Sequence, residues 1–146
     1  MDVDFLLRLN DEDFVKLYEN LNLANNIKKY KYEKNNESFL LACDRGHLEV
    51  IKYLISLPEK YKIDPSAMIN LAIRRASLYG RLEVVKYLIS LPEEYNIDPS
   101  ADNNYAIKWA SYNGHLDVVN YLMSLPKEYN IDPAFAYINP GYQKFK

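Results

Sequence analysis

The chain is poor in cysteine, in glycine and in runs of like charge, and each shortage excludes a class of protein. Its 146 residues hold one cysteine, Cys43, so neither an intrachain disulfide nor a cysteine-based zinc cluster can form. The formal net charge is −2 without a basic block, which argues against nucleic acid as a partner. The four glycines do not form a phosphate-binding loop.

A long apolar run is missing as well. A bilayer-spanning helix needs roughly 18 to 20 apolar residues, and no stretch of this sequence approaches that length. The start, MDVDFLLRLNDED, carries acidic residues where a secretory signal has a basic head. We therefore expect no membrane partner and an intracellular, cytoplasmic location.

What the sequence has instead is a repeat. The stretch GHLEVIKYLISLPEKYKIDPSA, residues 46–67, returns from residue 80 as GRLEVVKYLISLPEEYNIDPSA and from residue 114 as GHLDVVNYLMSLPKEYNIDPAF. Successive copies start 34 residues apart, and the first two agree at 18 of 22 positions. A fixed period between about 20 and 50 residues is the mark of a stacked repeat protein. The sequence predicts an all-α solenoid of antiparallel helix pairs joined by turn connectors.

The first helix of each pair is short and has the same flanking residues in every copy. An asparagine before it is predicted to accept a hydrogen bond from an orphan amide at the helix start, and a left-handed glycine ends it. The expected helices are Ser38–Arg45, Ala72–Tyr79 and Ala106–Asn113, preceded by Asn36, Asn70 and Asn104 and followed by Gly46, Gly80 and Gly114.

The second helix has an apolar stripe. In the first copy it is expected from Leu48 to about Leu57, where the following proline stops it. The residues Leu48, Ile51, Leu54 and Ile55 recur at helical spacing and are predicted to be buried.

The chain is predicted to be one domain, residues 1–146. Residues 2–22 align weakly with the repeat and are interpreted as a degenerate N-terminal capping unit, because terminal repeats meet water on one face. Residues 24–35 are polar and lysine-rich and are interpreted as a connecting loop. The full repeats are assigned to residues 36–69, 70–103 and 104–137, and residues 138–146 form a C-terminal tail.

The stretch NYAIKWASYNGHLDVVNYL, residues 104–122, resembles the ankyrin repeat, whose signature is an alanine-centred first helix, then G-H, then L-x-V-V-x-x-L. The resemblance covers residues 36–133 well. Two departures are clear. The T-P-L-H start is replaced by ESFL, LAIR and YAIK, and the connector LPEEYNIDPSA stands where the family commonly has a glycine-alanine-aspartate turn. The variety with DPSA turns is similar to ankyrin proteins of giant DNA viruses of amoebae, which implies a viral protein in the host cytoplasm.

The resemblance implies a non-enzymatic module that binds another protein, a host protein if the chain is viral, through a concave face. The exposed side of the first helix and the turn tips line that face in the family. Here residues 68–79 match residues 102–113 at only 5 of 12 positions, so side chains free of the stacking constraint are available to a ligand. The predicted protein-binding residues are Asp44, Arg45, Arg74, Leu78, Tyr79, Asp102, Asn103, Lys108, Tyr112 and Asn113. The alternative for each is that it is merely solvated.

Trp109 lies among these positions, and its core packing is favoured over contact with a partner. Two arrangements in the repeats have the form of a catalytic site. Cys43 with His47, and Ser111 with His115 and Asp117, could be arranged as nucleophile and base. At these positions the other copies of the repeat carry residues that suit helix packing or capping. We therefore predict no catalytic, cofactor or metal site.

The C-terminal end suggests a second hypothesis. The next first helix should start near residue 140, where the chain has Pro140 and Gly141. The outer face of the third repeat is then uncovered unless apolar tail residues fold over it; these are Phe135, Tyr137, Ile138, Tyr142 and Phe145. Exposed apolar surface of this kind marks an association site. The alternative function is therefore self-association through this face.

Overall fold

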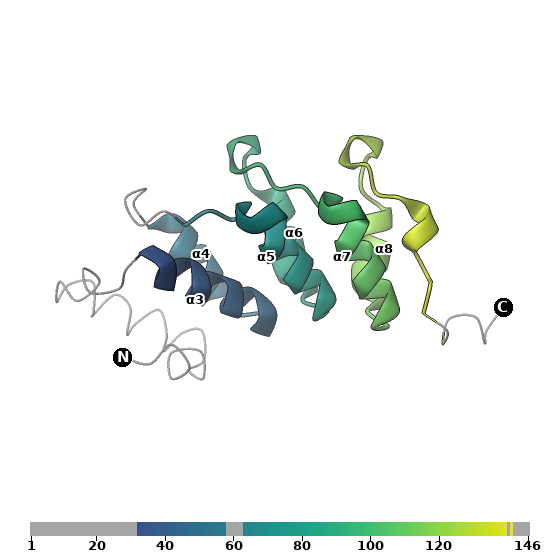
Figure 1. Cartoon of the computed structure of the whole chain (residues 1–146), viewed down its shortest axis with the longest axis horizontal. Coiled ribbons are helices and arrows are strands. Elements are labelled where there is room, and N and C mark those ends of the chain that lie inside the picture. Colours follow the sequence, from purple (N-terminus) through teal and green to yellow (C-terminus); the bar gives the residue numbers. More distant parts are fainter. Residues whose placement is uncertain (1–31, 58–62, 140, 142–146) are drawn as a thin grey trace. The chain divides into compact units, whose positions relative to one another are not determined.

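The computed structural model describes residues 32–57, 63–139 and 141, with the side chains of residues 32–35 excepted. The chain divides into two compact units, Met1–Asp64 and Pro65–Lys146. The N-terminal capping unit predicted at 2–22 lies outside the described residues. The described part is all-helical, with six α-helices and three short 3₁₀ helices (Figure 1).

The described part of the first unit is one helix pair. Helix α3, Tyr32–Arg45, is followed by α4, Leu48–Ser56, and Gly46 between them has a φ of 73°. Because only glycine adopts such a conformation without steric cost, the chain reverses there and α4 folds back on α3. Residues 32–35 are helical, although they belong to the segment 24–35 predicted as a loop.

The second unit holds two further helix pairs and their connectors. Helix α5 packs side by side with α7, and α6 contacts α8, so equivalent helices stack on one another (Figure 1). In chain order the elements are α5 (Ala67–Leu78), α6 (Leu82–Ser90), η3 (Glu93–Tyr95), α7 (Ala101–Tyr112), α8 (Leu116–Met123), η4 (Lys127–Tyr129) and η5 (Pro133–Phe135).

The second helices carry the core as predicted, with a shift in the stripe. Ile51 and Leu54 are fully buried, whereas Leu48 and Ile55 are half-buried. Val50 was not predicted to be in the stripe and is 1% exposed. The buried side therefore runs through residues at positions 50, 51 and 54, and the equivalent buried residues of the later copies are Val84, Val85, Leu88, Val118, Val119 and Leu122.

The repeated asparagines do not cap their own helices, so that prediction was wrong. Each side-chain oxygen instead accepts a hydrogen bond from the backbone amide of an aspartate 28 residues later. The N–O distances are 3.2 Å for Asn36 and Asp64, 2.9 Å for Asn70 and Asp98, and 3.0 Å for Asn104 and Asp132. The asparagine thus fastens the connector that follows the second helix to the first helix of the same repeat.

A left-handed turn interrupts the start of α5 and of α7. Residues 68–70 have φ between 55° and 58°, and residues 102–104 have φ between 55° and 59°. The right-handed helix proper follows these turns, close to the predicted starts at Ala72 and Ala106. A run of three non-glycine residues with positive φ is strained, because each Cβ crowds the following carbonyl oxygen.

The start of the C-terminal tail lies against the third repeat. The backbone amide of Ile138 donates to Ser111 Oγ at 2.6 Å, and Asn139 Nδ2 donates to the Tyr112 carbonyl at 2.8 Å. The Tyr137 hydroxyl donates to Asn120 Oδ1 at 2.5 Å. Inside the unit, Asn113 Nδ2 makes the equivalent bond to the carbonyl of Leu78 at 3.2 Å. The side-chain amide of Asn139 therefore makes the hydrogen bond that an asparagine of a following repeat would make.

Candidate functional site

The predicted binding residues fall in both units. Asp44 and Arg45 belong to the first unit, where Asp44 is half-buried and Arg45 exposed. The other eight lie on α5 and α7 or directly after them, and the structure brings several of these into contact within the second unit. Five of the eight are exposed: Tyr79, Asp102, Asn103, Tyr112 and Asn113. The other three, Arg74, Leu78 and Lys108, are half-buried.

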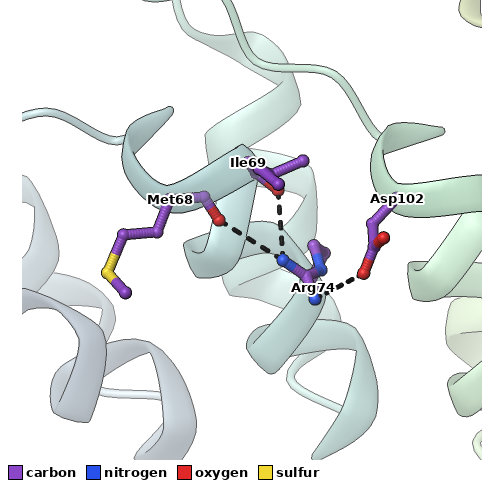
Figure 2. Close-up of polar contacts among 4 residues, drawn as sticks. All are labelled: Met68, Ile69, Arg74 and Asp102. Carbon is purple, nitrogen blue, oxygen red and sulfur yellow. Dashed lines mark hydrogen bonds and ion pairs between the residues drawn. The ribbon is translucent and has the colours of Figure 1, made fainter.

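Arg74 is held by three partners within the second unit (Figure 2). Its Nη1 donates to the carbonyl oxygens of Met68 at 3.3 Å and Ile69 at 3.4 Å, and its Nη2 lies 2.7 Å from Asp102 Oδ2. The Arg74 side chain is 14% exposed, against 47% for Asp102. Arg74 therefore satisfies carbonyls of the left-handed turn on α5 and joins that turn to the equivalent turn on α7.

Three aromatic side chains follow one stripe of α7. Trp109 lies between Tyr105 and Tyr112, with ring centroids 5.8 Å and 5.4 Å away. The guanidinium of Arg74 sits over the Tyr105 ring at 4.4 Å from its centroid. Trp109 is half-buried, so the predicted packing role describes only part of its surface. Tyr105 was not predicted as a site residue, although its spacing of four from Trp109 was a usable signal.

The large apolar side chains most exposed in the described part of the chain lie in the left-handed turn at the start of α5. Met68 is 70% exposed and Ile69 is 66% exposed, while Tyr79 and Tyr112 are 47% and 57% exposed. The left-handed conformation directs Met68 and Ile69 away from the core, which sequence periodicity does not reveal. We call the set of residues Met68, Ile69, Tyr79, Trp109 and Tyr112, which lie on the first helices or directly after them, the aromatic face.

Lys108 and Asn113 also have intramolecular partners. The Lys108 ammonium lies 5.5 Å from the centroid of the Phe135 ring, which is a cation–π distance. Asn113 bonds the Leu78 carbonyl, so part of its side chain serves the stacking of repeats. The hydroxyl groups of Tyr79 and Tyr112 form none of the hydrogen bonds found in the described part of the chain.

The residues considered for catalysis serve packing and hydrogen bonding. Cys43 is fully buried, and the buried Ser111 hydroxyl accepts from the Ile138 amide. Asp117 Oδ1 accepts from the amide of Val118 at 2.8 Å. In the described residues no group of three or more histidine, cysteine, aspartate or glutamate side chains could hold a metal ion. None of the helices in the described part is long and apolar enough to cross a membrane.

One tyrosine of α8, Tyr121, has a shifted pKa. Burial raises the pKa of Tyr121 above its ordinary value of 10.0, and the neighbouring Tyr129 adds to the shift. Its phenol is therefore neutral at physiological pH, and Lys86 Nζ lies 5.6 Å from the ring centroid.

Stacked helix pairs with left-handed glycines at each reversal define a helical repeat protein. The model of the family described as ankyrin repeats matches the chain over residues 8–103 and 39–133, with three copies. The chain belongs to the ankyrin repeat family. No curated protein and no solved structure matches it significantly. Ankyrin repeats are generally protein–protein interaction modules and are typically non-enzymatic.

Proposed function

We propose that this chain is a non-enzymatic module that binds a partner protein through the aromatic face and the polar residues around it. The observation that carries the proposal is the exposure of Met68, Ile69, Tyr79 and Tyr112 on one set of first helices and turns. Tyrosine, tryptophan and arginine are the residues that most often anchor protein interfaces, because they bury large areas and still form hydrogen bonds.

Rigid support of this face favours the proposal. Arg74 holds the turn that carries Met68 and Ile69, and Trp109 packs against Tyr112. A surface that is already ordered loses little conformational entropy when it binds, so more of the contact energy appears as affinity. Asp102, Asn103 and Asn113 are exposed beside the aromatic side chains and can supply hydrogen bonds at the rim.

A triple substitution tests the face. We expect Tyr79→Ala, Lys108→Ala and Tyr112→Ala together to abolish capture of a partner, because anchor residues of an interface contribute about 2 kcal/mol or more each. Capture from a lysate of the native host cell, followed by mass spectrometry, identifies the partner, and titration calorimetry then measures its affinity. The helical circular dichroism signal should stay unchanged.

The matched control lies on the second helix α6. Glu83 and Lys86 form an exposed ion pair at 3.7 Å, and replacing both with alanine should leave capture intact. If the triple variant captures the same partner with unchanged affinity, the aromatic face is not the binding surface.

The cellular setting is part of the same proposal. The resemblance to repeats of giant DNA viruses of amoebae makes an amoebal host protein, met in the cytoplasm, the partner that we propose to search for first. Self-association through the third repeat remains an alternative, but the bonds from Ile138 and Asn139 occupy part of that face. Light scattering from micromolar to millimolar concentration separates the two, since a monomer at all concentrations removes the alternative.

A further inference from the structure

A groove lies between the two long connectors of the second unit, and no residue of the aromatic face lines it. The connector after α6 and the connector after α8 project to the same side beyond their helices (Figure 1). The space between them has a volume of about 720 Å³, and none of the ten predicted binding residues lines it. Ligand pockets of proteins commonly measure about 300 to 1,000 Å³, so the groove has the capacity to hold a side chain and its flanking backbone.

The two walls have the same local construction. Pro92 and Pro126 each precede a short 3₁₀ helix, and Asn96 and Asn130 end these helices with φ of 54° and 56°. Each asparagine amide donates to a carbonyl two residues earlier, at 3.1 Å and 3.2 Å. Asparagine tolerates the left-handed conformation, so both connectors adopt one defined shape.

The connector after α6 is also fastened to the helix layer. Asn70 is 8% exposed, and its amide donates to the Asn96 carbonyl at 3.3 Å while its oxygen accepts from the Asp98 amide at 2.9 Å. The first wall is therefore set in place before any ligand arrives. Preorganisation of this kind lowers the entropic cost of binding.

The charge of the groove has one sign. Among the residues that the structure describes, Glu93, Asp98 and Glu128 line it, and no lysine, arginine or histidine does. In the described part of the chain, none of these three carboxylates forms an ion pair with a cationic side chain. A cation entering the groove would thus meet acceptors that are not already neutralised.

Most of the remaining lining residues are apolar, and Asn96 and Asn130 are the polar exceptions. Pro92, Pro126 and the ring of Tyr129 face the same space as the carboxylates. The guanidinium of arginine stacks on aromatic rings and forms paired hydrogen bonds with carboxylates, and its aliphatic stem packs on apolar walls. Lysine offers a compact charge without the planar surface, so arginine fits this lining better.

We infer that the groove between the connectors binds an arginine side chain carried by an extended segment of a partner protein. The guanidinium lies between Glu93 and Glu128, and the stem lies against the prolines. This site goes beyond the proposed aromatic face and does not depend on it.

The probe is a fluorescein-labelled peptide of sequence GPLRLRPG, titrated with the full chain and followed by fluorescence anisotropy. A second peptide carries citrulline at both arginines, which keeps the shape and removes the charge. We expect the arginine peptide to bind at least about tenfold more tightly, because the citrulline peptide loses the charge-assisted hydrogen bonds. Amide shifts in a nitrogen-15 NMR spectrum should concentrate in residues 93–98 and 127–130.

Neighbouring glutamates supply a matched pair of variants. Glu93 lines the groove, whereas Glu94 lies in the same 3₁₀ helix outside the lining, and both side chains are exposed. Glu93→Gln should weaken the arginine peptide by about tenfold, and Glu94→Gln, with the same change in net charge, should leave its affinity within about twofold. Both variants keep the side-chain size, so the fold is retained.

Several results would overturn the inference. They are equal binding of the two peptides, an equal loss from Glu93→Gln and Glu94→Gln, absence of binding up to about millimolar peptide, or shifts concentrated outside the connectors. The triple variant of the aromatic face should bind the peptide normally. A failure of the groove and a failure of the aromatic face are therefore separate results.

Discussion

The two helix pairs of the second unit have nearly the same backbone, but different side chains stabilise it. Both first helices begin with three left-handed residues, at 68–70 and at 102–104. Asp102, Asn103 and Asn104 belong to the residue types that enter this conformation most readily. Met68 and Ile69 do not, and Ile69 is β-branched, which makes positive φ especially unfavourable.

The difference shows how a strained turn is retained when its residues do not favour it. Arg74 donates to the carbonyls of Met68 and Ile69, whereas its equivalent on α7, Lys108, lies over the Phe135 ring. Local residue preference thus stabilises one turn and a side-chain clamp stabilises the other. Met68 and Ile69 are then free to be apolar and exposed, which the proposed binding face needs.

The largest loss of stability is expected from substitution of the glycines at which the two helix pairs reverse direction. Gly80 has φ of +72°, and a Cβ placed on it would lie 2.4 Å from Nδ1 of His115. Gly114 has φ of +78°, and its Cβ would meet Asn139 Nδ2 at 3.4 Å. We expect Gly80→Ala to lower the free energy of unfolding by about 3 kcal/mol and Gly114→Ala by about 1 kcal/mol, since the first adds a clash to the strain. Urea denaturation measures both.

The excess cost at Gly80 should come from one contact. In a His115→Ala background the clash is removed, and Gly80→Ala should then cost about as much as Gly114→Ala. Equal costs of the two glycine substitutions in the unmodified chain would show that the imidazole moves aside freely and that the comparison does not hold there.

The second expected difference is between the equivalent residues Arg74 and Lys108, because only Arg74 bonds the left-handed turn of its own helix. Arg74→Ala should lower the free energy of unfolding by about 2 kcal/mol, because it removes charge-assisted hydrogen bonds and the ion pair with Asp102. Lys108→Ala should cost less than about 0.5 kcal/mol. Both are measured by urea denaturation.

If the residues of the turn on α5 favoured the left-handed conformation, the hydrogen bonds from Arg74 should matter less for stability. Ile69→Asn should therefore recover part of the loss in the Arg74→Ala variant, by about 0.5 to 1 kcal/mol. If Arg74 and Lys108 are equally dispensable, the turn on α5 is held by something other than the guanidinium.

The sequence predicted the scaffold well because the scaffold depends on local patterns. The 34-residue period, the second helices and the left-handed glycines were all readable, and Gly46, Gly80 and Gly114 have φ between 72° and 78°. The role of the asparagines was predicted wrongly because their partner, an aspartate amide, lies 28 residues away. The groove was also missed, since it forms between connectors that meet only after the repeats stack.

The candidate binding face stays a prediction, and the structure shows only how exposed each of its residues is. Tyr79 and Tyr112 are exposed, as a binding role requires, but Arg74 is mostly committed to the fold. Variation between copies marks positions that stacking does not fix, and it does not distinguish an exposed anchor from a clamp. The exposure of Met68 and Ile69 was not predicted, because nothing in their type indicates a left-handed, exposed turn.

The smallest difference expected between equivalent residues of the two helix pairs concerns two serines. Ser77 and Ser111 are both fully buried, but the hydroxyl of Ser111 accepts from the Ile138 amide, whereas that of Ser77 has no hydrogen-bond partner in the described part of the chain. Ser111→Ala should cost about 1 kcal/mol, because a buried amide loses its acceptor. Ser77→Ala should be neutral or slightly stabilising, since it removes an unsatisfied buried hydroxyl. Urea denaturation of the two variants side by side measures this, with hydrogen exchange of the Ile138 amide as a second readout. Faster exchange in Ser111→Ala alone would tie the difference to the tail, and equal stability of the two variants would show that the tail does not stabilise the third repeat.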